Sequence, residues 1–199
     1  MSTSTPPIGL PRVAAVVLTG GAGVRLGGVD KASIEVGGVT MLERAITTIA
    51  SAGEVVVVGE QVPTSRPATW TRESPVGGGP AAGLLAGLDV LLVPPDLVCV
   101  LAVDMPRVTP STVARLIAAV SADDDADAAV LVDQDGRRQT LAGVYRYTAL
   151  MSARPTDREH EHGLSIRQLI APLRLIEVAS VDDEARDVDT WEDLRALSE

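Results

Sequence analysis

The chain has 199 residues, with 17 Lys and Arg against 27 Asp and Glu, so its net charge is −10. That charge argues against DNA or RNA as a partner, because nucleic-acid binding requires a basic face. No uninterrupted apolar stretch is long enough to cross a bilayer, which argues against a membrane protein.

We expect no signal peptide in the first residues. Residues 1–11 contain Ser, Thr and Pro, but neither the charged segment nor the apolar segment of a signal peptide. We expect a disordered arm there. We expect a single domain over residues 12–199, since a chain of this length buries enough surface for one core.

A glycine-rich loop, residues 18–31, follows the first predicted strand, Val13–Val17. Glycines let several backbone N–H groups approach a phosphate, and Arg25 and Lys31 add two cations. Lys31 is the only lysine of the chain, and its compact ammonium acts as a point charge on a phosphate oxygen. The loop therefore predicts a site for a polyphosphate such as a nucleoside triphosphate. The alternative is a glycine-rich turn with two solvated cations.

Helices and strands then alternate. The predicted elements are a strand over 33–36, a helix over 41–51, a strand over 55–58 and a short edge strand over 70–73. The helix is predicted from Thr40 and Glu43, which have the spacing of a capping box. Four consecutive valines, 55–58, indicate a strand that is buried on both faces.

A second glycine segment, residues 74–83, precedes another predicted helix. Pro80 suits the first turn of that helix. The N-terminus of a helix favours an anion or a polar ligand, so this segment is a second candidate for nucleotide contact. The alternative is that residues 77–79 form a loop without a ligand and that Gly83 is a packing contact.

The most apolar predicted strand, Leu97–Val103, ends at Asp104. A carboxylate just past the carboxyl end of a buried parallel strand lies where open α/β sheets bind ligands. Beside a triphosphate its expected role is Mg²⁺ coordination, and the alternative is a turn residue ahead of Pro106. Cys99, the only cysteine, lies within this strand, which predicts a buried thiol in a reducing cytoplasm.

The C-terminal half continues the alternation. The predicted elements are a helix over 110–120, strands over 128–132 and 140–145, a helix over 163–171, a strand over 173–178 and a helix over 190–197. Thr109 and Thr190 are the predicted N-caps of the first and last helices, with Asp193 as the capping-box partner of Thr190. The whole order predicts an α/β fold, a three-layer α/β/α sandwich with a mostly parallel, Rossmann-like sheet.

Three polar segments of this half each have two interpretations. Arg137-Arg138 either binds the phosphate of an acceptor substrate or is a pair of surface charges. Glu159-His160-Glu161-His162 is interpreted as part of a mobile loop, with a zinc site as the alternative. Asp187-Val188-Asp189 places both carboxylates on one side of an extended chain, either as a metal ligand or as polar residues before a helix.

Four segments together resemble the motifs of the molybdenum cofactor guanylyltransferase family, a branch of the nucleotidyltransferases that begin with a Leu-Ala-Gly-Gly loop. They are Leu18-Thr19-Gly20-Gly21, Arg25 to Lys31, Gly79-Pro80-Ala81-Ala82-Gly83 and Asp104-Met105-Pro106. The resemblance runs in order from about Val13 to Leu197. It implies a fold of the nucleotide-diphospho-sugar transferase type. It also implies Mg²⁺-dependent transfer of GMP from GTP to the phosphate of molybdopterin, which gives the guanine dinucleotide cofactor and pyrophosphate.

The resemblance also implies a role for each matching residue. The implied nucleotide-binding residues are Leu18, Thr19, Gly20, Gly21, Lys31, Glu73, Gly79, Gly83 and Asp104. The implied catalytic residues are Arg25, Lys31 and Asp104, and the implied metal ligands are Asp104 and Asp189. The implied partners are a nucleoside triphosphate, a molybdopterin-type acceptor and, transiently, molybdoenzymes or other proteins of cofactor biosynthesis.

Some positions depart from the family pattern. Thr19 replaces a small apolar Ala, Leu26 replaces the usual Met, and Asp187-Val188-Asp189-Thr190 replaces Asn-Ile-Asn-Thr. Asp at both places is closer to the cytidylyl branch, so a molybdopterin cytidylyltransferase or a relative with another phosphorylated acceptor is the alternative enzyme. A non-catalytic nucleotide-binding protein is the second alternative.

Overall fold

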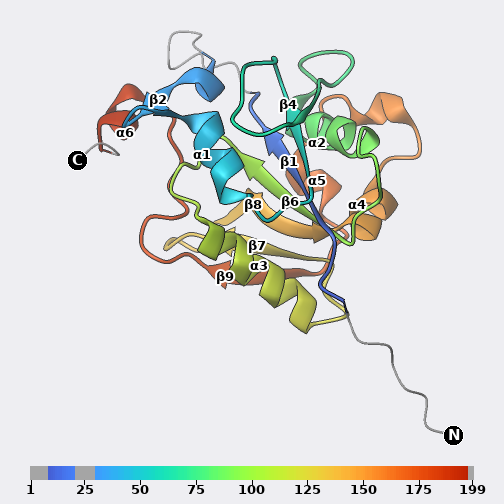
Figure 1. Cartoon of the computed structure of the whole chain (residues 1–199). Helices are drawn as coiled ribbons and strands as arrows, with labels where there is room; N and C mark the ends of the chain where they lie inside the picture. Colours follow the sequence, from blue (N-terminus) through green and yellow to red (C-terminus); the bar gives the residue numbers. More distant parts are fainter. Residues whose placement is uncertain (1–8, 21–29, 197–199) are drawn as a thin grey trace, which may run out of the picture.

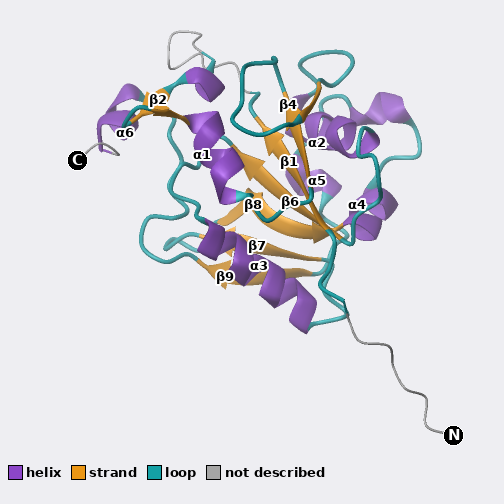
Figure 2. Cartoon of the chain, in the orientation of Figure 1, coloured by secondary structure: helices purple, strands orange, loops and turns teal. Residues whose placement is uncertain are grey.

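The structure is a computed structural model that describes residues 9–20 and 30–196. Its centre is a seven-stranded sheet with the order β5-β4-β1-β6-β8-β7-β9 (Figure 2). The strands are β1 (Val13–Leu18), β4 (Glu54–Val58), β5 (Thr69–Thr71), β6 (Leu97–Ala102), β7 (Ala128–Val132), β8 (Arg138–Arg146) and β9 (Leu175–Ala179). A separate hairpin consists of β2 (Glu35–Val36) and β3 (Val39–Thr40).

The sheet is mostly parallel. β1 pairs in parallel with β4 on one side and with β6 on the other, and Leu18 is level with both Val58 and Ala102. β4 with β5 and β7 with β9 are also parallel, whereas β8 runs antiparallel to its neighbours β6 and β7. The segments that follow β1, β4 and β6 therefore leave the sheet at one edge, side by side.

Helices cover both faces of the sheet (Figure 1). They are α1 (Met41–Thr48), α2 (Gly79–Asp89), α3 (Pro110–Ala122), α4 (Tyr147–Ala153), α5 (Ile166–Leu169) and α6 (Trp191–Ala196), with the 3-10 helices η2 (Lys31–Ser33) and η3 (Arg158–Glu161). Successive strand side chains point to opposite faces. Val17 and Val57 thus pack in one core cluster with α1 and α3, and Val16 and Val56 pack in the other with α2, α4 and α5. The predicted three-layer α/β/α sandwich is confirmed.

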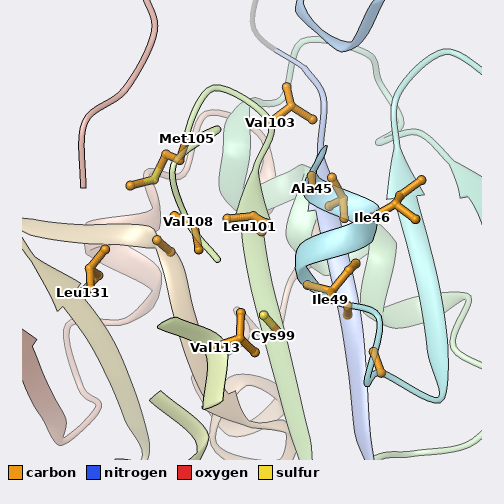
Figure 3. Close-up of a cluster of buried hydrophobic side chains, with 14 of the residues drawn as sticks. Ala45, Ile46, Ile49, Cys99, Leu101, Val103, Met105, Val108, Val113 and Leu131 are labelled. Atoms are coloured by element: carbon orange, nitrogen blue, oxygen red, sulfur yellow. The ribbon is translucent and has the colours of Figure 1, made fainter. Parts of the chain in front are cut away.

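Figure 3 shows part of the first cluster, in which side chains from α1, β6, β7 and α3 meet. Cys99 lies in this cluster and is buried, as predicted, and burial raises the pKa of its thiol to about 12. The sequence contains no phenylalanine, and the core consists mainly of aliphatic side chains. In the described ranges, no helix combines the length and the apolar character that spanning a membrane requires.

Some predicted elements differ from the observed ones. The helix expected over 41–51 ends at Thr48, and its capping box is half formed: Thr40 accepts a hydrogen bond from the N–H of Glu43, but the Glu43 carboxylate accepts bonds from Ser65. The strand expected over 33–36 begins only at Glu35, because residues 31–33 form η2. Helix α4 was not predicted, and the predicted loop at 155–163 contains η3. The expected arm, residues 1–11, lies mostly outside the described residues.

Candidate functional site

The candidate site lies at the carboxyl edge of the sheet, beyond β1 and β6. β4 pairs with one side of β1, and β6, which follows later in the chain, pairs with the other side. Where the strand order reverses in this way, α/β sheets have a crevice that binds ligands. Two backbone hydrogen bonds fix the strand ends: Thr19 N donates to Val58 O (3.1 Å), and Val103 N donates to Leu18 O (3.1 Å). The residues after β1 and β6 therefore start from fixed positions.

Lys31 is the centre of this site. Its Nζ donates to Asp104 Oδ2 (3.2 Å), to Asp189 Oδ1 (2.8 Å) and to the carbonyl oxygen of Val188 (3.1 Å). Only 12% of its side chain is exposed. Asp30 is the N-cap of η2 and accepts a hydrogen bond from Ala32 N (3.1 Å). Val188 N donates to Asp104 O (2.8 Å), which links the segments that carry the two carboxylates. Three of the residues predicted from the sequence thus meet at one ammonium group.

Burial and charge oppose each other at this cluster. Burial alone would lower the pKa of Lys31, but the hydrogen bond to Asp189 and the charge of Asp104 outweigh it, so the pKa of Lys31 is raised. Burial raises the pKa of Asp104, and Asp187 and Asp189 add to this effect, while Lys31 partly opposes it. Lys31 is therefore charged at neutral pH, and it offsets the repulsion among carboxylates that share a small volume.

The two carboxylates that hold Lys31 fit a magnesium site. Mg²⁺ is commonly bound by one or two carboxylates together with substrate phosphates and water. Asp104 and Asp189 come from segments far apart in the sequence, yet their oxygens converge on one positive group. In the described part of the chain, no group of three or more His, Cys, Asp or Glu side chains is placed to hold a metal. Asp104 and Asp189 are therefore the residues that would hold Mg²⁺ at this site.

Thr19 is held by the strand next to it. Its side-chain hydroxyl donates to Val58 O (3.0 Å), and its backbone N–H donates to the same oxygen. A β-carbon added at Gly59 would lie 1.8 Å from Thr19 Oγ1, so the threonine requires a glycine at position 59. The threonine at this position is thus accommodated inside the fold, and Gly20, the next residue, is exposed.

The second glycine segment turns sharply into α2. Gly79 has a φ of +88°, a conformation that favours glycine, and Gly78 precedes the helix as its N-cap. Glu73 accepts a hydrogen bond from Gly77 N (3.0 Å), which folds the segment back on itself. Gly83 is buried under the sheet, where an added β-carbon would touch Val58 (3.4 Å). The structure gives Gly83 a packing role, and its contact with a nucleotide stays a prediction.

A cavity of about 550 Å³ lies beside this segment. Three parts of the chain line it: residues 71–75 at and after the end of β5, α2 with Ala82 and Ala86, and the η3 segment with Glu161 and His162. Of the predicted residues, Glu73 lines this cavity, whereas Lys31 and Asp104 do not. The sequence analysis interpreted residues 159–162 as part of a mobile loop or a zinc site, and it did not connect them with the second glycine segment.

Four other residues were predicted to contact the nucleotide or an acceptor phosphate. Gly21 and Arg25 lie outside the described residues. Leu18 ends β1. Arg138 forms a salt bridge with Glu177 (2.7 Å) between two exposed side chains, which gives that arginine a surface role.

Comparison with known proteins identifies the family of this chain. A family model described as the MobA-like NTP transferase domain matches residues 15–177. A molybdenum cofactor guanylyltransferase from Acidiphilium cryptum is 46% identical over 82 residues, which are 37% of this chain and 40% of that protein. A probable molybdenum cofactor guanylyltransferase from Opitutus terrae is 30% identical over 186 residues, which are 90% of each chain.

One solved structure extends the comparison to the fold. The molybdopterin-guanine dinucleotide biosynthesis protein A from Archaeoglobus fulgidus superposes with a TM-score of 0.70 at 19% identity, covering 93% of this chain and 96% of that one. At that identity the likeness concerns the fold, and it confirms the predicted nucleotide-diphospho-sugar transferase type.

Proposed function

The chain belongs to the MobA-like NTP transferase family, and on that premise we propose that it transfers GMP from GTP to the phosphate of molybdopterin. The products are the guanine dinucleotide cofactor and pyrophosphate. The observation that carries this proposal is the convergence of Lys31, Asp104 and Asp189 at the carboxyl edge of the sheet. It supplies an ammonium for phosphate oxygens and two carboxylates for a divalent cation.

The chemistry of this transfer needs no strong base. An oxygen of the acceptor phosphate attacks the α-phosphorus of GTP, and the bond from that phosphorus to the bridging oxygen breaks, so that its electron pair leaves with pyrophosphate. The attacking oxygen is already ionised at neutral pH, so no side chain has to remove a proton. Catalysis therefore consists of positioning the two phosphates and neutralising the charge that grows on the leaving group.

Each residue of the site has one part in this proposal. Lys31, with Arg25 from the preceding loop, neutralises charge on the triphosphate, and the backbone of Gly20 and Gly21 contacts the nucleotide. Glu73 and Gly79 hold its nucleoside end. Asp104 and Asp189 hold Mg²⁺, which when bound supplies further positive charge to the phosphates. When the triphosphate binds, Lys31 exchanges its carboxylate partners for phosphate oxygens.

The test is to incubate the purified protein with molybdopterin, Mg²⁺ and GTP, CTP or ATP in separate reactions, and to identify the product by mass. We expect the guanine dinucleotide, with equimolar pyrophosphate. Substituting Asp104→Asn is expected to abolish the product without preventing folding, which provides a matched negative control. A protein that forms no dinucleotide from any of the three triphosphates contradicts the proposal.

A specific observation favours CTP as the second candidate. The segment Asp187-Val188-Asp189 has carboxylates where the guanylyl branch has amides, and Asp189 is bonded to Lys31 at 2.8 Å. The asparagine that the guanylyl branch has at position 189 would carry no charge to pair with that ammonium, so this ion pair separates the chain from the guanylyl pattern. A cytosine dinucleotide formed in preference to the guanine dinucleotide would favour this candidate. Molybdoenzymes that accept the finished cofactor are proposed as transient partners in either case.

A further inference from the structure

The segment around η3 lies against the second glycine segment. In Figure 1, the chain between α4 and α5 passes beside α2. Gly163 N donates a hydrogen bond to Gly78 O (2.8 Å). A β-carbon added at Gly78 would lie 3.5 Å both from His162 and from Glu73. Residues 158, 159, 161 and 162 of this segment form one wall of the cavity, and Glu73 lies in another.

One arginine holds this wall in place. Arg154, which follows α4, donates to both oxygens of Asp89 at the end of α2 (2.5 and 2.9 Å). It also donates to both oxygens of Glu161 in η3 (2.7 and 3.3 Å). Only 10% of the Arg154 side chain and 13% of the Glu161 side chain are exposed. Such forked contacts fix the orientation of both partners as well as their distance.

The charges explain why the arginine is needed. Asp89 and Glu161 contact the same guanidinium, so without it two carboxylates would face each other in a partly buried space. Their repulsion would push η3 away from α2. The hydrogen bond from Arg154 and its charge lower the pKa of Asp89, which shows that the ionised carboxylate is the favoured form. Arg158 also contacts Asp89 (3.2 Å), but its side chain is exposed and does not reach across to Glu161 in this way.

We propose that Arg154 is a positioning residue for nucleotide binding: by bridging Asp89 and Glu161 it holds residues 158–164 against Gly78 and Gly79. The proposal rests on the function proposed above, since it assumes that the second glycine segment contacts a nucleoside triphosphate. Arg154 itself touches no reacting atom. It raises the fraction of molecules in which the glycine segment is ready to bind, and the apparent dissociation constant falls in inverse proportion to that fraction.

The test compares GTP binding and turnover in four variants. Arg154→Gln and Glu161→Gln each release η3, and we expect the dissociation constant and KM for GTP to rise about tenfold while kcat changes less than about twofold. Asp89→Asn leaves the bond between Arg154 and Glu161 intact, so its rise is expected to be smaller than that of Glu161→Gln. Arg154→Lys keeps the charge and is expected to restore part of the affinity.

The matched control is Arg146→Gln. Arg146 is also partly buried and donates to the carbonyls of Val120, Asp123 and Ala126, but it pairs with Leu97 at the amino end of β6, opposite to the site. Its loss is expected to lower the midpoint of thermal unfolding without changing GTP affinity. Hydrogen exchange provides the second readout: the Gly163 amide should exchange faster in Arg154→Gln and Glu161→Gln, and at the native rate in Arg146→Gln.

Three results would overturn the proposal: unchanged GTP affinity in Arg154→Gln and Glu161→Gln, an equal loss of affinity in Arg146→Gln, or a Gly163 amide that stays protected without Arg154. The affinity is measured by calorimetry and does not require turnover. Absence of the dinucleotide product therefore contradicts the proposed function alone. If the wild type forms the product and Arg154→Gln and Glu161→Gln bind GTP as tightly as the wild type, the result contradicts the role of Arg154 alone.

Discussion

The substitution Lys31→Arg keeps the charge at the centre of the candidate site and changes its shape. Three acceptors converge on the Lys31 ammonium at 2.8 to 3.2 Å, and its side chain is only 12% exposed. A guanidinium is longer and planar, and its donors point outward in a fork, so it cannot serve acceptors that converge on one point. The charge that should meet a phosphate oxygen is then misplaced.

The magnitude follows from that loss. Removing one group that stabilises transition-state charge costs about 10²- to 10³-fold in kcat. We expect Lys31→Arg to lose about 10²-fold, and Lys31→Met at least as much. Breaking a buried ion pair costs about 3–5 kcal/mol, but the Asp104 and Asp189 side chains are 31% and 42% exposed, so Lys31→Met should lower the free energy of unfolding by only about 1–2 kcal/mol.

The assay is pyrophosphate release with molybdopterin and GTP, together with urea denaturation of each variant. Arg146→Lys is the control for a charge-conserving change away from the site, and its kcat is expected to match that of the wild type. If Lys31→Arg turns over at the wild-type rate, then the compact shape of the lysine ammonium has no special role at this position.

Three other predictions concern stability and reactivity. Gly59→Ala is expected to destabilise the protein by about 1–3 kcal/mol in urea denaturation, because its β-carbon meets Thr19 Oγ1, and Thr19→Ala in the same chain should recover part of that loss. Burial opposes ionisation of Glu184, but hydrogen bonds led by that from Arg115 lower its pKa to about 2. A carboxylate whose pKa is lowered by folding stabilises the protein above its unfolded pKa of about 4.5, and this stability is lost as the pH falls towards 2. In Glu184→Gln the free energy of unfolding should therefore depend less on pH between about 4.5 and 2. The same pH dependence in the variant and the wild type would contradict this. Burial raises the pKa of Cys99 to about 12, so a thiol reagent at pH 8 should label it only after unfolding, and rapid labelling of the native protein would refute its burial.

Local patterns were enough for most elements. The valines of β4 and the apolar run of β6 predicted buried strands, because a parallel sheet covered on both faces needs apolar side chains on both. The capping box of Thr190 and Asp193 formed as predicted, since its bonds join residues three positions apart. Helix α4 was missed because it follows β8 directly and Arg146 provides no side-chain cap, so the chain carries no start signal there.

Other features depended on residues distant in the sequence. Glu43 did not complete its capping box, because Ser65, 22 residues away, offers its carboxylate two hydrogen bonds. The order of the strands was not predicted either: β8 lies between β6 and β7. The sequence predicted a loop or a zinc site at residues 159–162, but it did not predict that Glu161 contacts Arg154 or that Gly163 contacts Gly78.

By itself, the sequence determined the fold class and the family, and it predicted Lys31 and Asp104 as members of a phosphate and metal site. These predictions rest on neighbouring residues. Glycines allow backbone conformations that other residues avoid, the alternation of apolar and polar residues indicates which face of a strand is buried, and the residue after a strand lies at the end of the sheet. Only the tertiary structure decided that one ammonium lies between Asp104 and Asp189, which are 73 and 158 residues from Lys31. Such contacts depend on how the strands order themselves in the sheet, and no local pattern encodes that order.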